Sequence, residues 1–551
     1  MNFKTSRTRS LVTVVLATVA LVLSGCAESE REGSGGEGDS GEPSTFVFAG
    51  SAEPGALDPV FVSDGESFRV ARQIFEGLVG TVPGTADPAP LLAKDWTVSE
   101  DGLTYDFTLQ TGVKFHDGTD FNAEAVCANF ERWYNLPESA QSDDLAYYYS
   151  VIFRGFATGP RTDAALYDSC TANGEDQVTI ELTGPFAGFI SSLSLPAFSM
   201  QSPSALKKFG DDGAANPATT EYATSEPTGT GPFVLDSWER GQQVTLNANP
   251  DYWGEKAKID EAIIVAIADT KARATALENG EIDGYDLVGP ADIEPLQEAG
   301  YQIINREPFN VLYLGMNQKT EPLDDIRVRQ AINYAIDKQA VADASLPEGT
   351  KLATIFMPDL VNGYTEDVET YDYDPEMAEQ LLEEAGADGA TIEFNYPTDV
   401  SRPYMPSPED TFNIVRSQLE AVGLKIKPTA DVWDPDYLEQ IQGTEDHGIH
   451  LLGWTGDYND SDNFLGVFFG AETSEWGFTN EELFSDLGDA REIPTPEEQQ
   501  PVYEQINKDI MEFLPGVPLA HPVPSLAFAE NVKGYQQSPV QDEVWNVVTV
   551  E

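Results

Sequence analysis

Basic residues are scarce in this chain. Its 551 residues include 31 Lys and Arg against 94 Asp and Glu, which gives a formal net charge of −63 at pH 7. A surface this negative repels phosphate and excludes a nucleic-acid partner. The carboxylates are scattered along the whole chain, so we interpret them as a solvated acidic surface suited to a salty or alkaline exterior.

Cysteine and histidine are also scarce, with three and four residues. These numbers exclude a disulfide-rich scaffold, and no Cys/His spacing is typical of a metal site, so we predict no metal and no cofactor. Apart from Cys26 near the N-terminus, the cysteines are Cys127 and Cys170. Two cysteines in the body of an exported protein predict one disulfide between them. Two free buried thiols are the alternative.

Long apolar runs are absent beyond the N-terminus, so we expect the body of the protein to lie outside the membrane. Residues 11–23 are apolar, follow Lys4, Arg7 and Arg9, and run into Leu23-Ser24-Gly25-Cys26. This order predicts a lipoprotein signal peptide over residues 1–25, with lipidation at Cys26. The alternative is a plain secretory signal with an incidental cysteine. Residues 26–44 are mostly Glu, Gly, Ser and Asp and predict a disordered linker.

Several catalytic motifs are missing: Gly-x-Ser-x-Gly, His-Glu-x-x-His and a phosphate loop. No repeat of 20–50 residues indicates a solenoid or propeller. A secreted hydrolase is the alternative from another class, since abundant carboxylates could supply a pair for glycoside hydrolysis. In a chain this acidic, carboxylate pairs occur by chance, so they are almost no evidence for a hydrolase.

The patterns that are present indicate an α/β protein. Asp101-Gly102 separates two alternating stretches and predicts a hairpin. Phe115-His116-Asp117-Gly118 predicts the end of another strand. Residues 135–176 look like a loop-rich insertion. From Val311 onward helical and strand patterns alternate, which predicts largely parallel sheets. In this part Asp325 is the expected N-cap of one helix and Gly386 the expected end of another.

The Gly- and Pro-rich turn of residues 227–233, followed by two strand patterns and Asn249-Pro250-Asp251-Tyr252-Trp253-Gly254, predicts a β-hairpin with rigid corners. This stretch resembles the signature of the family 5 extracytoplasmic solute-binding proteins, the peptide-binding lipoproteins of ABC importers. The resemblance implies a two-lobe, periplasmic-binding-protein-like clam (class C type) with an extra β-rich domain. It places the first lobe at residues 45–83, 196–306 and 522–551, the inserted subdomain at 84–195, and the second lobe at 307–521.

The main candidate for binding is the segment Gly453-Trp454-Thr455-Gly456-Asp457-Tyr458. The resemblance implies that Asp457 pairs with a ligand's α-ammonium, a suitable partner for a charge taken out of water. Gly453 and Gly456 would allow close backbone approach. A plain turn is one alternative. A calcium loop through Asp457, Asn459 and Ser461 is another, although its sixth position is Asp462 rather than Gly.

The second candidate is Arg402, in Arg402-Pro403-Tyr404. The resemblance implies that its guanidinium binds the ligand's C-terminal carboxylate, which suits a planar, permanently charged fork. A plain surface arginine is the alternative.

These observations predict a monomeric, lipid-anchored binding protein on the extracytoplasmic face of the cell membrane. It would capture di- or oligopeptides, pass them to ABC permease subunits and perform no chemistry. Another small solute (an oligosaccharide, an amino-acid derivative or a metal chelate) is the alternative ligand. A nickel- or haem-binding branch of the family exists, but no His, Cys or Met cluster points to it.

Overall fold

The structure is a computed structural model that describes residues 44–142 and 145–551. The predicted signal peptide, Cys26 and all of the linker except Ser44 lie outside the described residues. None of the helices in the described part is both long and apolar enough to cross a membrane.

The first lobe is built on a seven-stranded sheet. Its strand order is β12-β19-β11-β1-β10-β9-β8. In that order the bounds are Gln302–Asn305, Ser525–Phe528, Gly284–Tyr285, Thr45–Gly50, Glu261–Ala266, Gln243–Ala248 and Phe233–Glu239. β1 is parallel to β10 and β11, and the other pairs are antiparallel. Helices α5, α6, α7 and α8 also belong to this lobe, at Pro203–Phe209, Glu221–Thr224, Thr270–Glu278 and Pro290–Glu298.

The second lobe is built on a six-stranded sheet with the order β14-β18-β13-β17-β15-β16. The bounds are Lys351–Leu352, Gly516–His521, Asn310–Met316, Ile449–Thr455, Thr391–Thr398 and Lys425–Val432. β15 is parallel to both neighbours, whereas β13 is antiparallel to both. The sheets are therefore mixed, and the prediction of largely parallel sheets was wrong. β13 brings the chain into this lobe and β18 leads it out, so the two neighbours must run in opposite directions.

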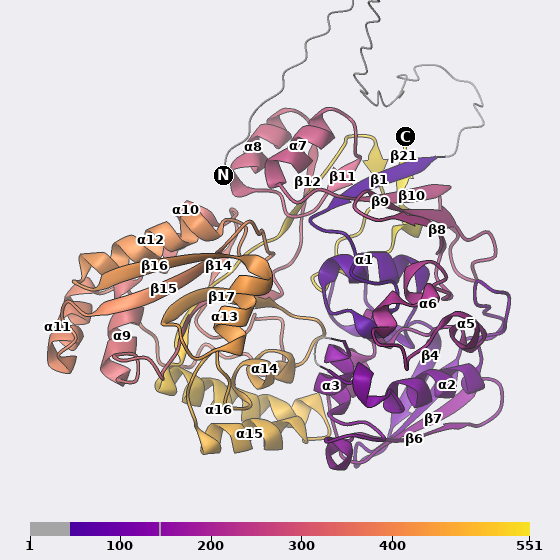
Figure 1. The fold of residues 1–551 in the computed structure, drawn as a ribbon, viewed down its shortest axis with the longest axis horizontal. Coiled ribbons are helices and arrows are strands. Elements are labelled where there is room, and N and C mark those ends of the chain that lie inside the picture. The colour runs from indigo at the N-terminus through magenta and orange to yellow at the C-terminus, as the bar shows by residue number, and fades with distance from the viewer. Residues whose placement is uncertain (1–43, 143–144) are drawn as a thin grey trace, which may run out of the picture. The chain divides into compact units, whose positions relative to one another are not determined.

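Helices accompany the second sheet, as Figure 1 shows. They are α9 to α12 at Ile326–Ala335, Lys338–Ser345, Pro375–Ala385 and Pro408–Ala421, and α13 to α16 at Leu438–Gly443, Leu465–Phe469, Glu481–Arg491 and Pro496–Phe513. Two predicted ends are confirmed. Asp325 caps α9 by accepting from the Arg327 N–H, and Gly386 ends α11 with φ +70°.

The chain passes between the two sheets twice, at residues 306–309 and 522–524. The Arg306 N–H donates to the carbonyl of Pro524 at 2.9 Å, and Asn310 Nδ2 donates to the carbonyl of Pro522 at 3.1 Å. The predicted lobe boundaries, after residues 306 and 521, fall on these two connections.

The hairpin of residues 227–254, which carries the family signature, is hydrogen-bonded to a buried carboxylate that follows α1 (Gly65–Ile74). Glu76 accepts hydrogen bonds from Thr230 Oγ1 at 2.7 Å, from Tyr252 OH at 2.7 Å and from Trp253 Nε1 at 2.8 Å. The hairpin turns at Gly241, whose φ of +72° suits glycine. The signature residues of this stretch therefore have a structural role in the first lobe.

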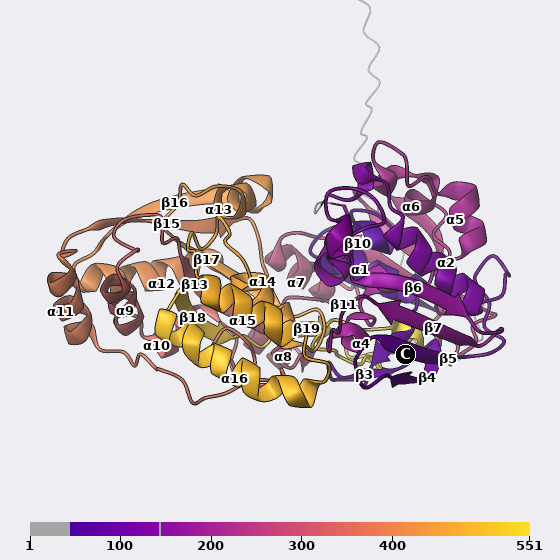
Figure 2. The same ribbon diagram turned by 90° about the horizontal axis from the view of Figure 1, so that it is seen from below.

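A smaller antiparallel sheet lies within the predicted insertion, with the order β4-β5-β7-β6. Its strands are Ala93–Val98, Thr104–Leu109, Gln177–Leu182 and Tyr167–Ala172, and α2 (Ala123–Tyr134) packs on β6 and β7 (Figure 2). Cys127 of α2 is bonded to Cys170 of β6. The predicted boundary after residue 83 falls inside the hairpin of β2 (Val79–Thr81) and β3 (Pro88–Pro90).

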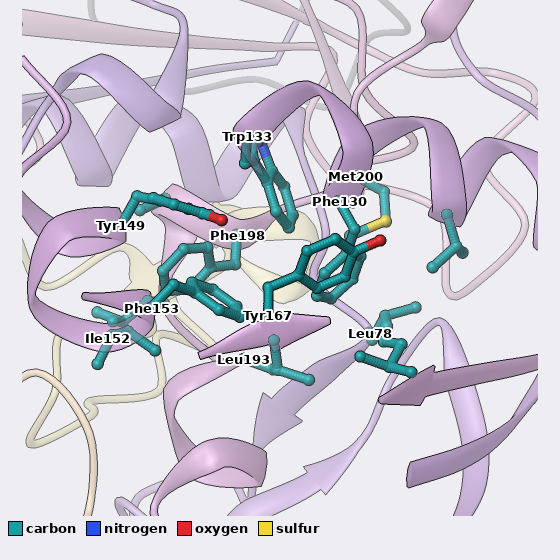
Figure 3. Close-up of a cluster of buried hydrophobic side chains, with 14 of the residues drawn as sticks. Leu78, Phe130, Trp133, Tyr149, Ile152, Phe153, Tyr167, Leu193, Phe198 and Met200 are labelled. Carbon is teal, nitrogen blue, oxygen red and sulfur yellow. The ribbon is translucent and has the colours of Figure 1, made fainter. Parts of the chain in front are cut away.

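Two local predictions for this region were wrong. His116 and its neighbours end no strand, because pairing there is a single bridge between Lys114 and Asp120. The stretch 135–176 is not merely a loop, since it contains β6 and the helix α3 (Tyr147–Phe153). Figure 3 shows why: Tyr149, Ile152 and Phe153 point into the apolar cluster around α2, and burying them fixes the helix.

Candidate functional site

The two predicted binding segments lie at one edge of the second sheet. β15 and β17 are neighbouring parallel strands, with Phe394 opposite Ile449, so their carboxyl ends meet at the same edge. The loop after β15 carries Arg402 and Tyr404, and the loop after β17 carries Asp457. Loops at the carboxyl ends of parallel strands are the usual place for ligands in α/β sheets.

Asp457 is a half-buried carboxylate held in a fixed orientation. Its Oδ1 accepts from Tyr148 OH at 2.8 Å, and its Oδ2 accepts a longer hydrogen bond from Asn463 Nδ2 at 3.4 Å. Its backbone N–H donates to Asn463 Oδ1 at 2.8 Å. Burial raises the pKa of Asp457 to about 6, although these hydrogen bonds and the charge of Arg72 act in the opposite direction.

Arg402 lies over an aromatic ring. Its guanidinium carbon lies 4.4 Å from the centre of the Trp433 ring, and its backbone exchanges two hydrogen bonds with Met405. Tyr404 is buried, and burial raises the pKa of its hydroxyl to about 12. The turn therefore fixes Arg402 and Tyr404 together.

The two glycines of the Asp457 segment make room for aromatic rings. A Cβ at Gly453 would overlap the ring of Tyr404, and one at Gly456 would overlap the rings of Phe309 and Phe464. At both positions the close neighbours are side chains of this chain, and the expected approach of a ligand to the backbone stays a prediction. The contact of Tyr404 with Gly453 joins the two binding segments.

Several buried polar atoms of these segments have no hydrogen-bond partner among the described residues. They are Ser401 Oγ, Arg402 Nε, Trp454 Nε1, Thr455 Oγ1, Tyr458 OH and Asn459 Oδ1. Buried polar groups are nearly always paired, so such a concentration needs an explanation. Donors and acceptors of a polar ligand would supply partners for those that face the sheet edge.

Tyr458, a predicted binding residue, and Asn459, from the alternative calcium loop, contact residues outside this sheet edge. The Tyr458 ring is 1% exposed and belongs to the apolar cluster of the first lobe. Asn459 Nδ2 donates to Asp87 Oδ1 at 3.2 Å. Ser461 Oγ donates to the carbonyl of Asn362, so the side chains of the alternative calcium loop point to different partners. Among the described residues, no group of three or more His, Cys, Asp or Glu could hold a metal ion.

Sequence reasoning missed Tyr148, Asn463 and Trp433. Tyr148 belongs to a short helix more than 300 residues before its partner Asp457. The run Tyr147-Tyr148-Tyr149 was a visible signal, because three aromatic residues inside a polar stretch indicate a packed element.

The fold and this sheet edge together define a two-lobe solute-binding protein, and comparisons with known proteins agree. Residues 87–476 match the family described as bacterial extracellular solute-binding proteins, family 5 Middle. The chain belongs to this family.

Similar proteins differ in the ligands that their names state. Heme-binding protein A of Haemophilus influenzae is 30% identical over 98% of this chain and 99% of its own length. The dipeptide-binding protein of Escherichia coli is 30% identical over 92% of this chain and 95% of its own. Among solved structures, the periplasmic binding protein DppA of Helicobacter pylori, in complex with the peptide STSA, has a TM-score of 0.78. It is 26% identical and covers 92% of this chain and 98% of its own.

Proposed function

We propose that this protein captures di- or short oligopeptides with free ends and delivers them to the permease subunits of an ABC importer. The supporting observation is the pair Asp457 and Arg402, opposite charges carried by adjacent loops at one sheet edge. The relatives that are named as dipeptide- or di/tripeptide-binding proteins agree with this ligand class.

In this mechanism each end of the peptide meets an oriented charge. Asp457, oriented by Asn463 and Tyr148, takes the ammonium group, and Arg402, held on Trp433, takes the carboxylate. Trp454 Nε1 and Thr455 Oγ1 have no partner among the described residues, and in this proposal they would bond to the peptide's amide groups. The side chains bind and orient the ligand, and no bond is made or broken.

Calorimetry with end-blocked peptides tests the assignment. Asp457→Asn should weaken binding of a free-amine dipeptide and have little effect on its N-acetylated form. Arg402→Ala should discriminate in the same way between free-acid and amidated forms. Loss of either charge leaves the ligand's end desolvated and unpaired, at a cost of about 2–5 kcal/mol.

The matched controls are Asp446→Asn and Arg416→Ala, changes at charges outside this edge, and both should bind like the wild type. Haem, an oligosaccharide and a metal chelate belong in the same series, because a relative is named for haem and other small solutes are alternatives. Binding of one of these without binding of any peptide would sink the proposal, as would full affinity of the wild type for N-acetylated peptides.

We also propose that lipid on Cys26 holds the protein at the extracytoplasmic face of the membrane. The order of basic residues, apolar run and Leu-Ser-Gly-Cys supports this. Cys26→Ala should release the protein from the membrane fraction or block processing of the signal. Unchanged membrane association of this variant would refute it.

A further inference from the structure

Helix α3 of the first lobe is contacted at both ends by side chains of the second lobe. At its start, Tyr148 donates to Asp457. At its end, Arg491, the last residue of α15, donates through Nη2 to the carbonyls of Ile152 at 2.8 Å and Val151 at 3.2 Å.

The side chain of Arg491 is held in this position by contacts with both lobes. Its Nη1 donates to Asp462 Oδ2 at 2.5 Å, and its guanidinium carbon lies 4.3 Å from the centre of the Phe186 ring in the first lobe. The side chains of Arg491 and Asp462 are 7% and 8% exposed. A charge buried this deeply needs all of its partners, and here those partners come from both lobes.

The end of α3 needs an external donor. The last carbonyls of a helix have no partner within the helix, and α3 is followed by Arg154, a non-glycine residue with φ +61°. The Arg491 guanidinium caps two of these carbonyls, as cationic side chains at helix ends do. The capping group belongs to the other lobe, so this cap forms only when the two lobes are in contact.

Apolar packing around this contact is incomplete. A cavity of about 310 Å³ lies beside Arg491, lined among others by Tyr147 and Val151 of α3, by Gly466 of α14 with Gly470 directly after it, and by Leu487 of α15. The cavity leaves this side of α3 without tight apolar packing, and there Arg491 supplies polar contacts. On its other face α3 is fixed to its own lobe by Tyr149, Ile152 and Phe153 (Figure 3).

We propose that Arg491 is a closure-determining residue: it joins the second lobe to α3, stabilises the lobe contact that the structure shows whether or not a ligand is bound, and thereby favours the arrangement that holds a ligand. The inference rests on the proposed function. Asp457 and Asp462 belong to one short loop, in which Asn463 bonds to Asp457, so the ligand's ammonium subsite and the Arg491 contact share a support.

Two variants and a control test this role. Arg491→Met removes the hydrogen-bond donors but keeps most of the length of the side chain. Arg491→Lys keeps the positive charge but lacks the planar guanidinium that can donate to several acceptors at once. Arg416→Met is the control, because Arg416 pairs with its helix neighbour Glu420 on an exposed face of α12. Hydrogen exchange without any ligand should be at least tenfold faster over residues 147–157 in Arg491→Met than in the control, with Arg491→Lys between them.

Peptide affinity gives the second readout. Arg491→Met should weaken binding of free-amine and N-acetylated dipeptides by the same factor, at least tenfold, whereas Asp457→Asn discriminates between the two. Wild-type exchange over residues 147–157 in both Arg491 variants would overturn the proposal. So would an Arg491→Met effect confined to free-amine peptides. The exchange comparison needs no ligand, so it decides on Arg491 even if the protein binds another solute.

Discussion

At the scale of single residues, the candidate site depends on a carboxylate whose ionisation is finely balanced. Asp457 is half-buried, which raises its pKa to about 6, and the facing groups Tyr148, Asn463 and Arg72 limit that rise. Only the ionised form pairs with an ammonium group. In the proposed mechanism, the charge that Asp457 supplies for the ammonium group is therefore lost within the pH range in which the protein can be studied.

Peptide affinity should consequently depend on pH with a midpoint near 6. It should level off near pH 7 and fall as pH drops through 6, by up to tenfold per unit, because protonation of Asp457 removes the partner of the ammonium. Calorimetry between about pH 4.5 and 7 keeps the peptide's own amine largely charged.

Tyr148→Phe provides the matched comparison. It removes a hydrogen bond that lowers the pKa of Asp457, so the midpoint should move to higher pH. Affinity independent of pH between 5 and 7, or a midpoint that moves downward in Tyr148→Phe, would contradict this account.

Only part of this candidate site could be predicted from the sequence, and the reason is physical. Asp457 and Arg402 lie in short, distinctive motifs, so a resemblance could nominate them. Tyr148 and Trp433 meet them only through tertiary structure, because nothing within the local sequence of α3 or of residue 433 specifies the partner. Whether these residues bind a ligand stays a prediction.

At the scale of elements, predictions were right where local chemistry decides the outcome. The hairpin at Gly102, the cap at Asp325 and the end of α11 at Gly386 follow from residues that favour one backbone conformation. The direction of β13 and the existence of α3 depend on chain connections and on burial of aromatic residues. Those are long-range properties: the local pattern did not fix the direction of β13, and the three tyrosines of residues 147–149 indicated packing without specifying its partners.

The bond between Cys127 and Cys170 joins two elements, α2 and β6, across 43 residues of sequence. A loop of that length contributes about 4 kcal/mol to the free energy of unfolding in the chain-entropy model. Replacing both cysteines with serine should lower the unfolding free energy by about that amount, measured by denaturant titration. Peptide mapping without reductant should recover the linked pair. Alkylation of both thiols in the native, unreduced protein would refute the bond.

At the scale of the whole molecule, the formal net charge of −63 makes the surface repel itself. Some of the few basic residues are used in buried pairs, such as Arg69 with Asp286 at 2.6 Å and Arg306 with Glu543 at 2.6 Å. Salt screens exposed charges strongly and buried pairs weakly. Added salt should therefore relieve the repulsion at the surface and leave these internal pairs largely intact.

The melting temperature should accordingly rise by several degrees as NaCl increases from 10 mM to 1 M. Over that range the screening length falls from about 30 Å to about 3 Å, which removes most repulsion between neighbouring surface carboxylates. Differential scanning calorimetry with NaCl and with tetramethylammonium chloride separates screening from specific sodium binding, because screening predicts similar rises in the two salts. A rise in NaCl alone would indicate bound sodium ions. A flat or falling melting temperature in both salts would show that the acidic surface does not limit the stability of the fold.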